Sequence, residues 1–82
     1  MQRYLNLSGK SGIEAFRIED KSISVQFKKG RVYQYSENPI GSQHIENMKE
    51  LALAGQGLNT YISQNRDVYH GAVAIGGREL YR

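Results

Sequence analysis

The feature that most constrains this chain is an alternation of apolar and polar residues on both sides of a glycine turn. The run I-S-V-Q-F (23–27) precedes the turn K-K-G (28–30), and R-V-Y-Q-Y (31–35) follows it. A period of two with β-branched and aromatic residues is typical of half-buried strands. A third alternating run, A-F-R-I (15–18), ends at the polar turn E-D-K-S (19–22). We therefore predict a three-stranded antiparallel β-meander.

The length of the second turn decides which face of the sheet carries Tyr33 and Tyr35, because a slip of one residue turns every side chain over. A two-residue turn at Lys29-Gly30 would place both tyrosines on the polar face, where they could stack on bases. A three-residue loop over 28–30 would place them opposite the apolar residues of 23–27. The two-residue turn requires a positive φ at Lys29, whereas we expect the loop to require it only at Gly30, so sterics favour the loop. The other face would then hold Arg17, Ser24, Gln26, Val32 and Gln34, open to water.

Helices are predicted after the last strand. Asn38 can cap a helix and Pro39 suits its first turn, with the regular helix beginning near Ser42. A stripe at helical spacing follows, formed by Ile45, Met48, Leu51 and Ala52. Residues 55–57 (G-Q-G) break this helix, and a shorter second stripe contains Leu58, Tyr61 and Ile62. The predicted fold is α+β, with the meander covered on one face by one or two helices.

The order of these elements resembles the KTSC domain, a short module found at the C-terminus of some lysyl-tRNA synthetases and as a small free-standing bacterial or phage protein. The matching features are I-S-V-Q-F, K-K-G, Y-Q-Y (33–35), Pro39, the amphipathic helix, Gly55, Asn59 and Ile62. Two positions depart from the family pattern: Asn38 stands where an apolar residue is usual, and Leu58 where an aromatic one is usual. The resemblance implies RNA binding, through the synthetase context.

The chain of 82 residues is long enough for one domain. The resemblance covers residues 11–66, so we divide domain 1–82 into this core, an arm (1–10) and a tail (67–82). The tail could form a hairpin at Gly76-Gly77, or a single strand over 72–75 that pairs with residues 3–7. Both alternatives remain open from the sequence.

Several classes of chemistry are disfavoured. The chain has no cysteine, and His44 and His70 lack the spacing of metal ligands, so we expect no metal and no cofactor. His44 is expected to be exposed. No serine lies in a nucleophile-elbow context, and we do not expect an enzyme. The absence of cysteine, of a signal-type apolar stretch and of a bilayer-length apolar run predicts a cytoplasmic protein without membrane contact.

The net charge of +3 lies entirely in the first half, because residues 1–41 hold seven Lys/Arg and four Asp/Glu. The tightest cluster is Lys28, Lys29 and Arg31, and composition alone favours a solvated hairpin tip there. Combined with the family context, the cluster predicts weak binding of RNA or another nucleic acid. The candidate binding residues are Lys28, Lys29, Arg31, Arg17, Tyr33 and Tyr35.

The alternative function is a protein-interaction module that pairs with another copy or with a host or phage protein. It would use an edge strand and the terminal segments, whose apolar residues are Tyr4, Leu5, Leu7, Val73, Ile75 and Leu80.

Overall fold

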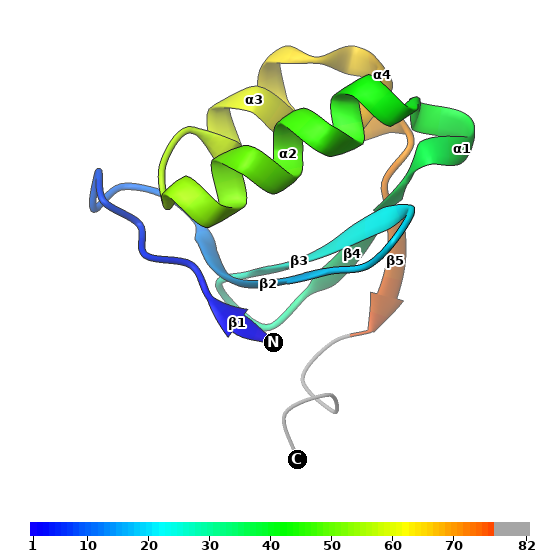
Figure 1. Cartoon of the computed structure of the whole chain (residues 1–82). Helices are drawn as coiled ribbons and strands as arrows, with labels where there is room; N and C mark the ends of the chain where they lie inside the picture. Colours follow the sequence, from blue (N-terminus) through cyan, green and yellow to red (C-terminus); the bar gives the residue numbers. More distant parts are fainter. Residues whose placement is uncertain (77–82) are drawn as a thin grey trace.

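The computed structural model describes residues 1–76, which form a five-stranded antiparallel sheet with helices over one face (Figure 1). The strands are β1 (Gln2–Arg3), β2 (Ile13–Ile18), β3 (Ser22–Phe27), β4 (Val32–Ser36) and β5 (Val73–Gly76), and they neighbour one another in this order. The helices are α1 (Glu37–Ile40), α2 (Ser42–Ala54), α3 (Leu58–Gln64) and α4 (Arg66–His70). The α+β class is confirmed, with five strands instead of the three predicted.

The register between β3 and β4 is the one that the three-residue loop predicts. Val25 pairs with Tyr33, and the Phe27 N–H donates to the Arg31 carbonyl oxygen at 2.8 Å. The steric argument for this register was incomplete, because φ is +78° at Lys29 as well as +89° at Gly30. Strain at one lysine costs about 1–2 kcal/mol, and burying one large side chain offsets it. Burial of Tyr35, more than turn sterics, therefore accounts for the register.

The helix-facing side of the sheet forms the core. Phe16, Ile23, Val25 and Tyr35 are buried there, against Ile45, Met48, Ala52, Leu58, Ile62 and Val68 of the helices. The opposite face is only partly open: Arg17 is exposed, but Ser24 and Val32 are buried. The prediction that this face is open to water is therefore wrong at the centre of the sheet, where Ser24 and Val32 lie. β5 pairs with β4, so β4 is an inner strand of the sheet. The residues of β4 therefore have neighbouring strands on both sides.

The helical region begins differently from the prediction and then follows it. Asn38 caps no helix, because its φ and ψ are −111° and 112° within α1, and Ser36 occupies the N-cap position. The peptide between Asn38 and Pro39 is cis. The regular helix α2 begins at Ser42, as predicted, and its stripe of Ile45, Met48 and Ala52 is buried.

The glycine break after α2 is confirmed, because Gly55 caps the helix in the left-handed conformation with φ of +78°. Leu58 and Ile62 of α3 are buried, as the second stripe predicts. The helix α4 was not predicted. It contributes the fully buried Val68 to the core, so residues 66–70 belong to the folded unit.

The arm and residues 73–76 are integrated into the fold. Tyr4 in the arm is buried, and its hydroxyl accepts the Leu58 N–H at 3.4 Å. β5 pairs with β4, so the alternative in which residues 72–75 pair with residues 3–7 is wrong. The second strand of a hairpin at Gly76-Gly77 would lie outside the described residues.

Candidate functional site

An aromatic pocket of about 420 Å³ lies at the closed end of the β3–β4 hairpin, on the side of the helices. We call it the aromatic pocket, and its lining residues are Phe27, Arg31, Tyr33, Tyr35, Tyr69 and Ala72. They come from the end of β3, the turn, β4, α4 and the α4–β5 junction. Four rings from three elements, β3, β4 and α4, therefore converge at one place, with a guanidinium beside them.

The four aromatic rings of the pocket differ in how deeply they are buried. Tyr35 is 2% exposed and belongs to the core, whereas Tyr69 on α4 is 44% exposed. Phe27 and Tyr33 are half-buried, with ring centroids 5.9 Å apart and planes at 74°. This edge-to-face contact is a favourable arrangement for aromatic pairs and keeps both rings in place. The pocket thus has a fixed base on the sheet and an accessible ring on the helix.

The Tyr35 hydroxyl has an altered acidity. Burial raises the pKa of Tyr35 well above its ordinary value of 10.0, and the neighbouring Tyr33 raises this pKa further by charge repulsion. A tyrosine at its ordinary pKa is already protonated at physiological pH, and the raised pKa extends this uncharged state to more alkaline pH. The base of the pocket carries no negative charge that would repel an anionic ligand.

The structure brings together only three of the six predicted binding residues. Arg31, Tyr33 and Tyr35 line the aromatic pocket. Lys29 is exposed at the tip of the turn. Lys28 lines a different hollow beside the arm, and its N–H donates to the Gly12 carbonyl oxygen at 2.7 Å.

Arg17 lies apart from the other predicted residues. It pairs with Ser24, next to the pair of Phe16 and Val25, whose side chains are in the core. Because successive side chains of a strand point to opposite faces, Arg17 projects from the face away from the helices.

Sequence reasoning missed Phe27, Tyr69 and Ala72 as pocket residues. Tyr69 was missed because α4 was not predicted. The signals for this short helix were present: Asn65 is a favoured N-cap residue, Asp67 suits the first turn, and Gly71 follows the last turn. Its approach to the hairpin depends on the path of the chain through α2 and α3.

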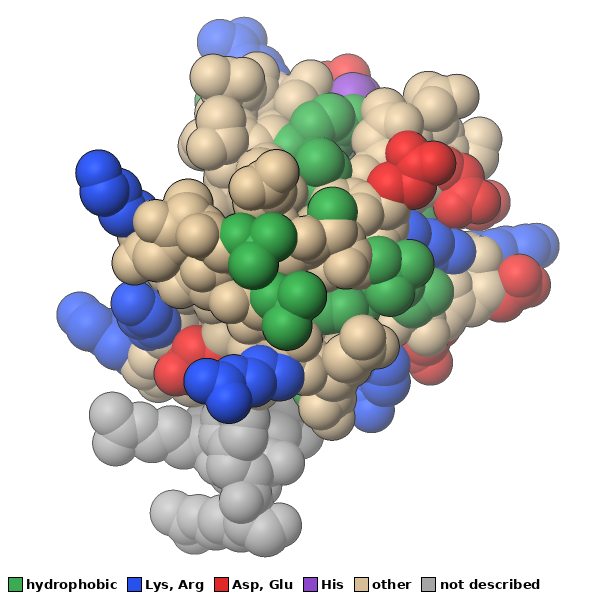
Figure 2. Space-filling view, turned by 60° about the vertical axis from the view of Figure 1, so that its left-hand side comes forward, with side chains coloured by type: hydrophobic (Ala, Val, Ile, Leu, Met, Phe, Trp, Pro, Cys, Tyr) green, Lys and Arg blue, Asp and Glu red, His purple; other side chains and the backbone are tan. Residues whose placement is uncertain are grey.

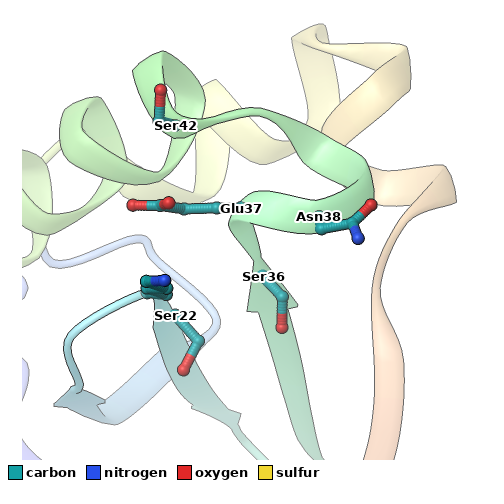
Figure 3. A pocket seen from close by; sticks show the side chains of 6 residues that line it. Ser22, Ser36, Glu37, Asn38 and Ser42 are labelled. Atoms are coloured by element: carbon teal, nitrogen blue, oxygen red, sulfur yellow. The ribbon is translucent and has the colours of Figure 1, made fainter.

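A second pocket of about 540 Å³ lies at the other end of the hairpin and is polar. Its lining residues are Lys21, Ser22, Ser36, Glu37, Asn38 and Ser42. Figure 3 shows that the hydroxyls of Ser36 and Ser42 point in opposite directions, and that the Asn38 side chain points away from Glu37. The groups do not converge on one point, and no histidine lines the pocket, so it lacks the arrangement of a hydrolytic site.

His44 has a structural environment. Its Nδ1 lies 2.7 Å from the Tyr61 hydroxyl, which also accepts a hydrogen bond from the Asn47 side chain at 3.0 Å. His44 is half-buried, so the expectation of an exposed side chain is wrong: α3 folds back over α2 and brings Tyr61 onto it. These hydrogen bonds link α2, which carries His44 and Asn47, to α3, which carries Tyr61.

Within residues 1–76, no group of three or more His, Cys, Asp or Glu is placed to hold a metal ion, and no helix has the length and apolarity to cross a membrane. Comparison of the chain with protein-family models, with curated proteins and with solved structures found no match. The resemblance to the KTSC domain therefore stays a prediction from the sequence.

Proposed function

We propose that this protein is a small non-enzymatic accessory module that binds RNA weakly through the closed end of the β3–β4 hairpin. The observation that carries the proposal is the position of Arg31, which lines one pocket together with Tyr33 and Tyr35. Arginine contacts phosphate and stacks on flat rings, and aromatic side chains stack on bases.

The neighbouring charges support the same ligand. Lys28 and Lys29 are exposed within three positions of Arg31, and none of the described residues that line the aromatic pocket is acidic. Such a corner attracts a phosphate backbone. Arg17 is left out of the proposed surface because it projects from the opposite face.

The expected affinity is weak and strongly salt-dependent. Three cations that each neutralise one phosphate of a single strand predict a loss of about 20-fold in affinity between 50 and 200 mM salt. A fluorescence-anisotropy titration with tRNA and with single-stranded RNA at these two concentrations measures the slope. No binding at about 50 mM salt, by protein that is folded by circular dichroism, would refute the proposal.

A pair of triple variants locates the binding surface. Replacing Lys28, Lys29 and Arg31 by serine should abolish binding. The matched control replaces Lys10, Arg17 and Lys21, which are also exposed, and lowers the net charge by the same amount. Equal loss in both variants would show a response to net charge alone, without a site at the tip.

A second candidate function is protein interaction, and exposed leucines of the arm and of α2 favour it. Leu5 is 64% exposed, Leu7 63% and Leu53 57%. We call them the leucine patch. Two of them lie beside Gly55: its carbonyl oxygen accepts the Leu7 N–H at 2.7 Å, and the Leu5 side chain lies next to it. Figure 2 shows hydrophobic side chains gathered on this side of the molecule.

The remaining apolar residues of the terminal segments divide between core and surface. Tyr4 is part of the core and offers nothing to a partner, whereas Val73 and Ile75 on β5 are exposed. Leu80 lies outside the described residues. Exposed apolar groups beside a strand are features of surfaces that pair with another chain.

Light scattering over a concentration range tests the version in which the partner is a second copy. Growth of the apparent mass with concentration, abolished by Leu5→Ser together with Leu7→Ser, would support it. A strict monomer at all concentrations would exclude it. The serine triple variant of the hairpin tip should leave self-association intact, which separates the two functions.

A further inference from the structure

The chemistry of the aromatic pocket restricts its ligand. Four of its six lining residues are aromatic, and the one charged residue is Arg31. Flat rings favour a planar ligand, and the Arg31 cation favours a negative charge on it, since no carboxylate lines the pocket within residues 1–76. Aromatic cages also bind ammonium groups, but the guanidinium at this site would repel them.

We propose that the pocket binds one unpaired nucleotide, with the base against Tyr69 and Tyr33 and the phosphate on Arg31. The inference deepens the proposed function, because it names the part of an RNA strand that the pocket would hold. For a nucleotide within a strand it rests on the proposed function. It also covers a free mononucleotide, which has the same chemistry. It adds Tyr69 to the binding residues.

The size and position of the pocket favour an unpaired base. Its volume of about 420 Å³ lies within the usual range of small-ligand sites. A base in a duplex has both faces covered by its neighbours, so it cannot enter between a sheet and a helix. An unpaired base or a strand end exposes its faces to the rings.

Tyr69 is the ring best placed to contact such a base. It is 44% exposed, and its ring centroid lies 4.7 Å from that of His70 with the planes at 59°. Val68 beside it is fully buried, which anchors the short helix α4 to the core. The accessible ring therefore stands on an anchored element and needs little reordering to stack on a base.

Calorimetric or anisotropy titration of the full chain at about 50 mM salt tests the inference with four ligands: a nucleoside monophosphate, ribose 5-phosphate, a single-stranded RNA octamer and a blunt eight-base-pair RNA duplex. We expect the monophosphate to bind better than ribose 5-phosphate. We expect the octamer to bind at least fivefold tighter than the duplex, since stacking of one base is worth about 1–3 kcal/mol.

Two substitutions at one position separate stacking from apolar contact. Tyr69→Leu keeps an apolar side chain but removes the flat ring, and should weaken binding of the octamer by roughly 5- to 100-fold. Tyr69→Phe keeps the ring and should bind as the wild type does. Neither change should alter binding of the duplex, and thermal melts should show that both variants are folded.

The outcomes distinguish this inference from the proposed function. Equal binding of octamer and duplex, unaffected by Tyr69→Leu, would overturn the unpaired-nucleotide site and leave general RNA binding standing. Binding of the monophosphate alone, sensitive to Tyr69→Leu and without binding of either RNA, would support a free-nucleotide site and overturn the proposed function. Absence of binding by all four ligands would overturn both.

Discussion

The two ends of the β3–β4 hairpin carry pockets of similar size and different chemistry. The closed end has the aromatic pocket, of about 420 Å³, with Arg31 beside its rings. The open end has the polar pocket, of about 540 Å³, around Ser36 and Glu37. At the polar end the side chains point apart, whereas at the aromatic end they come to one place from β3, β4, α4 and the two connections beside them. Convergence of side chains, more than volume, distinguishes a candidate site from a surface hollow.

The difference between the two pockets can be followed within the single strand β4, which contributes residues to both. Tyr35 and Ser36 are adjacent in β4, and the pleat sends their side chains to opposite faces of the sheet. Tyr35 lies under the helices, and Ser36 faces the polar pocket at the point where the chain leaves the sheet for α1. The substitutions below test how far the two ends differ.

The largest expected effect is at Tyr35. Tyr35→Ala should lower the free energy of unfolding by about 3–5 kcal/mol, because it leaves a cavity under the helices. Ser36→Ala, at the neighbouring position, should change it by less than about 0.5 kcal/mol. Urea denaturation followed by circular dichroism measures both. A small effect at Tyr35 would mean that the aromatic end is a surface platform and not part of the core.

The next effect is on the pH dependence of stability. Burial raises the pKa of Tyr35 in the folded state above its ordinary value of 10.0. Above about pH 10 the unfolded chain loses this proton while the folded chain keeps it, so stability falls as pH rises, by at most about 1.4 kcal/mol per pH unit from this group. Below that pH the contribution is constant.

Tyr35→Phe isolates this contribution, because it removes the hydroxyl and keeps the ring. The variant should lose stability less steeply than the wild type between pH 10 and 11.5, as measured by urea denaturation at each pH. Identical slopes for the two proteins would show that the hydroxyl is solvated in the folded state.

A smaller effect is expected at the turn of the closed end. Gly30 has φ of +89°, which a residue with a Cβ rarely adopts, so Gly30→Ala should cost about 1–2 kcal/mol. A Cβ at Gly12 would meet no atom within 4 Å, so Gly12→Ala is the control and should be nearly neutral. Thermal melts compare the two. Equal stability of both variants would contradict the assigned turn.

The smallest effect is a gain in stability at Lys29. Its φ of +78° strains the backbone, and glycine would adopt this angle freely. Lys29→Gly should therefore raise the free energy of unfolding by less than about 1 kcal/mol, since glycine also adds entropy to the unfolded chain. Lys29→Ser, which keeps a Cβ and removes the same charge, is the control. A gain with serine as large as with glycine would attribute the effect to charge.

Local patterns predicted much of the fold. The alternation in residues 15–35 predicted the strands β2 to β4, and the position of the glycine turn predicted the pairing of Val25 with Tyr33. The spacing of Ile45, Met48 and Ala52 predicted the buried stripe of α2. These features succeed because each depends on residues a few positions apart, for which backbone geometry allows few alternatives.

The sequence did not predict α4 and did not locate β1 within the arm. β1 has two residues, and α4 has five. Elements this short show no periodicity and are stable only when they pack on the rest of the fold. For the same reason the sequence could not choose a partner for the tail, and β5 pairs with β4 because α4 returns the chain to that edge.

The sequence by itself determined that Tyr33 and Tyr35 share a face with Val25 and that a basic turn lies beside them. Only the tertiary structure decided that Tyr69 meets them across a pocket and that Arg17 stands on the far side of the sheet. The physical reason is the distance along the chain between the residues involved. The register of a hairpin and an amphipathic stripe follow from the turn and from the apolar pattern of residues close in sequence. A pocket requires elements distant in sequence to meet, and the packing of the whole core fixes how they meet.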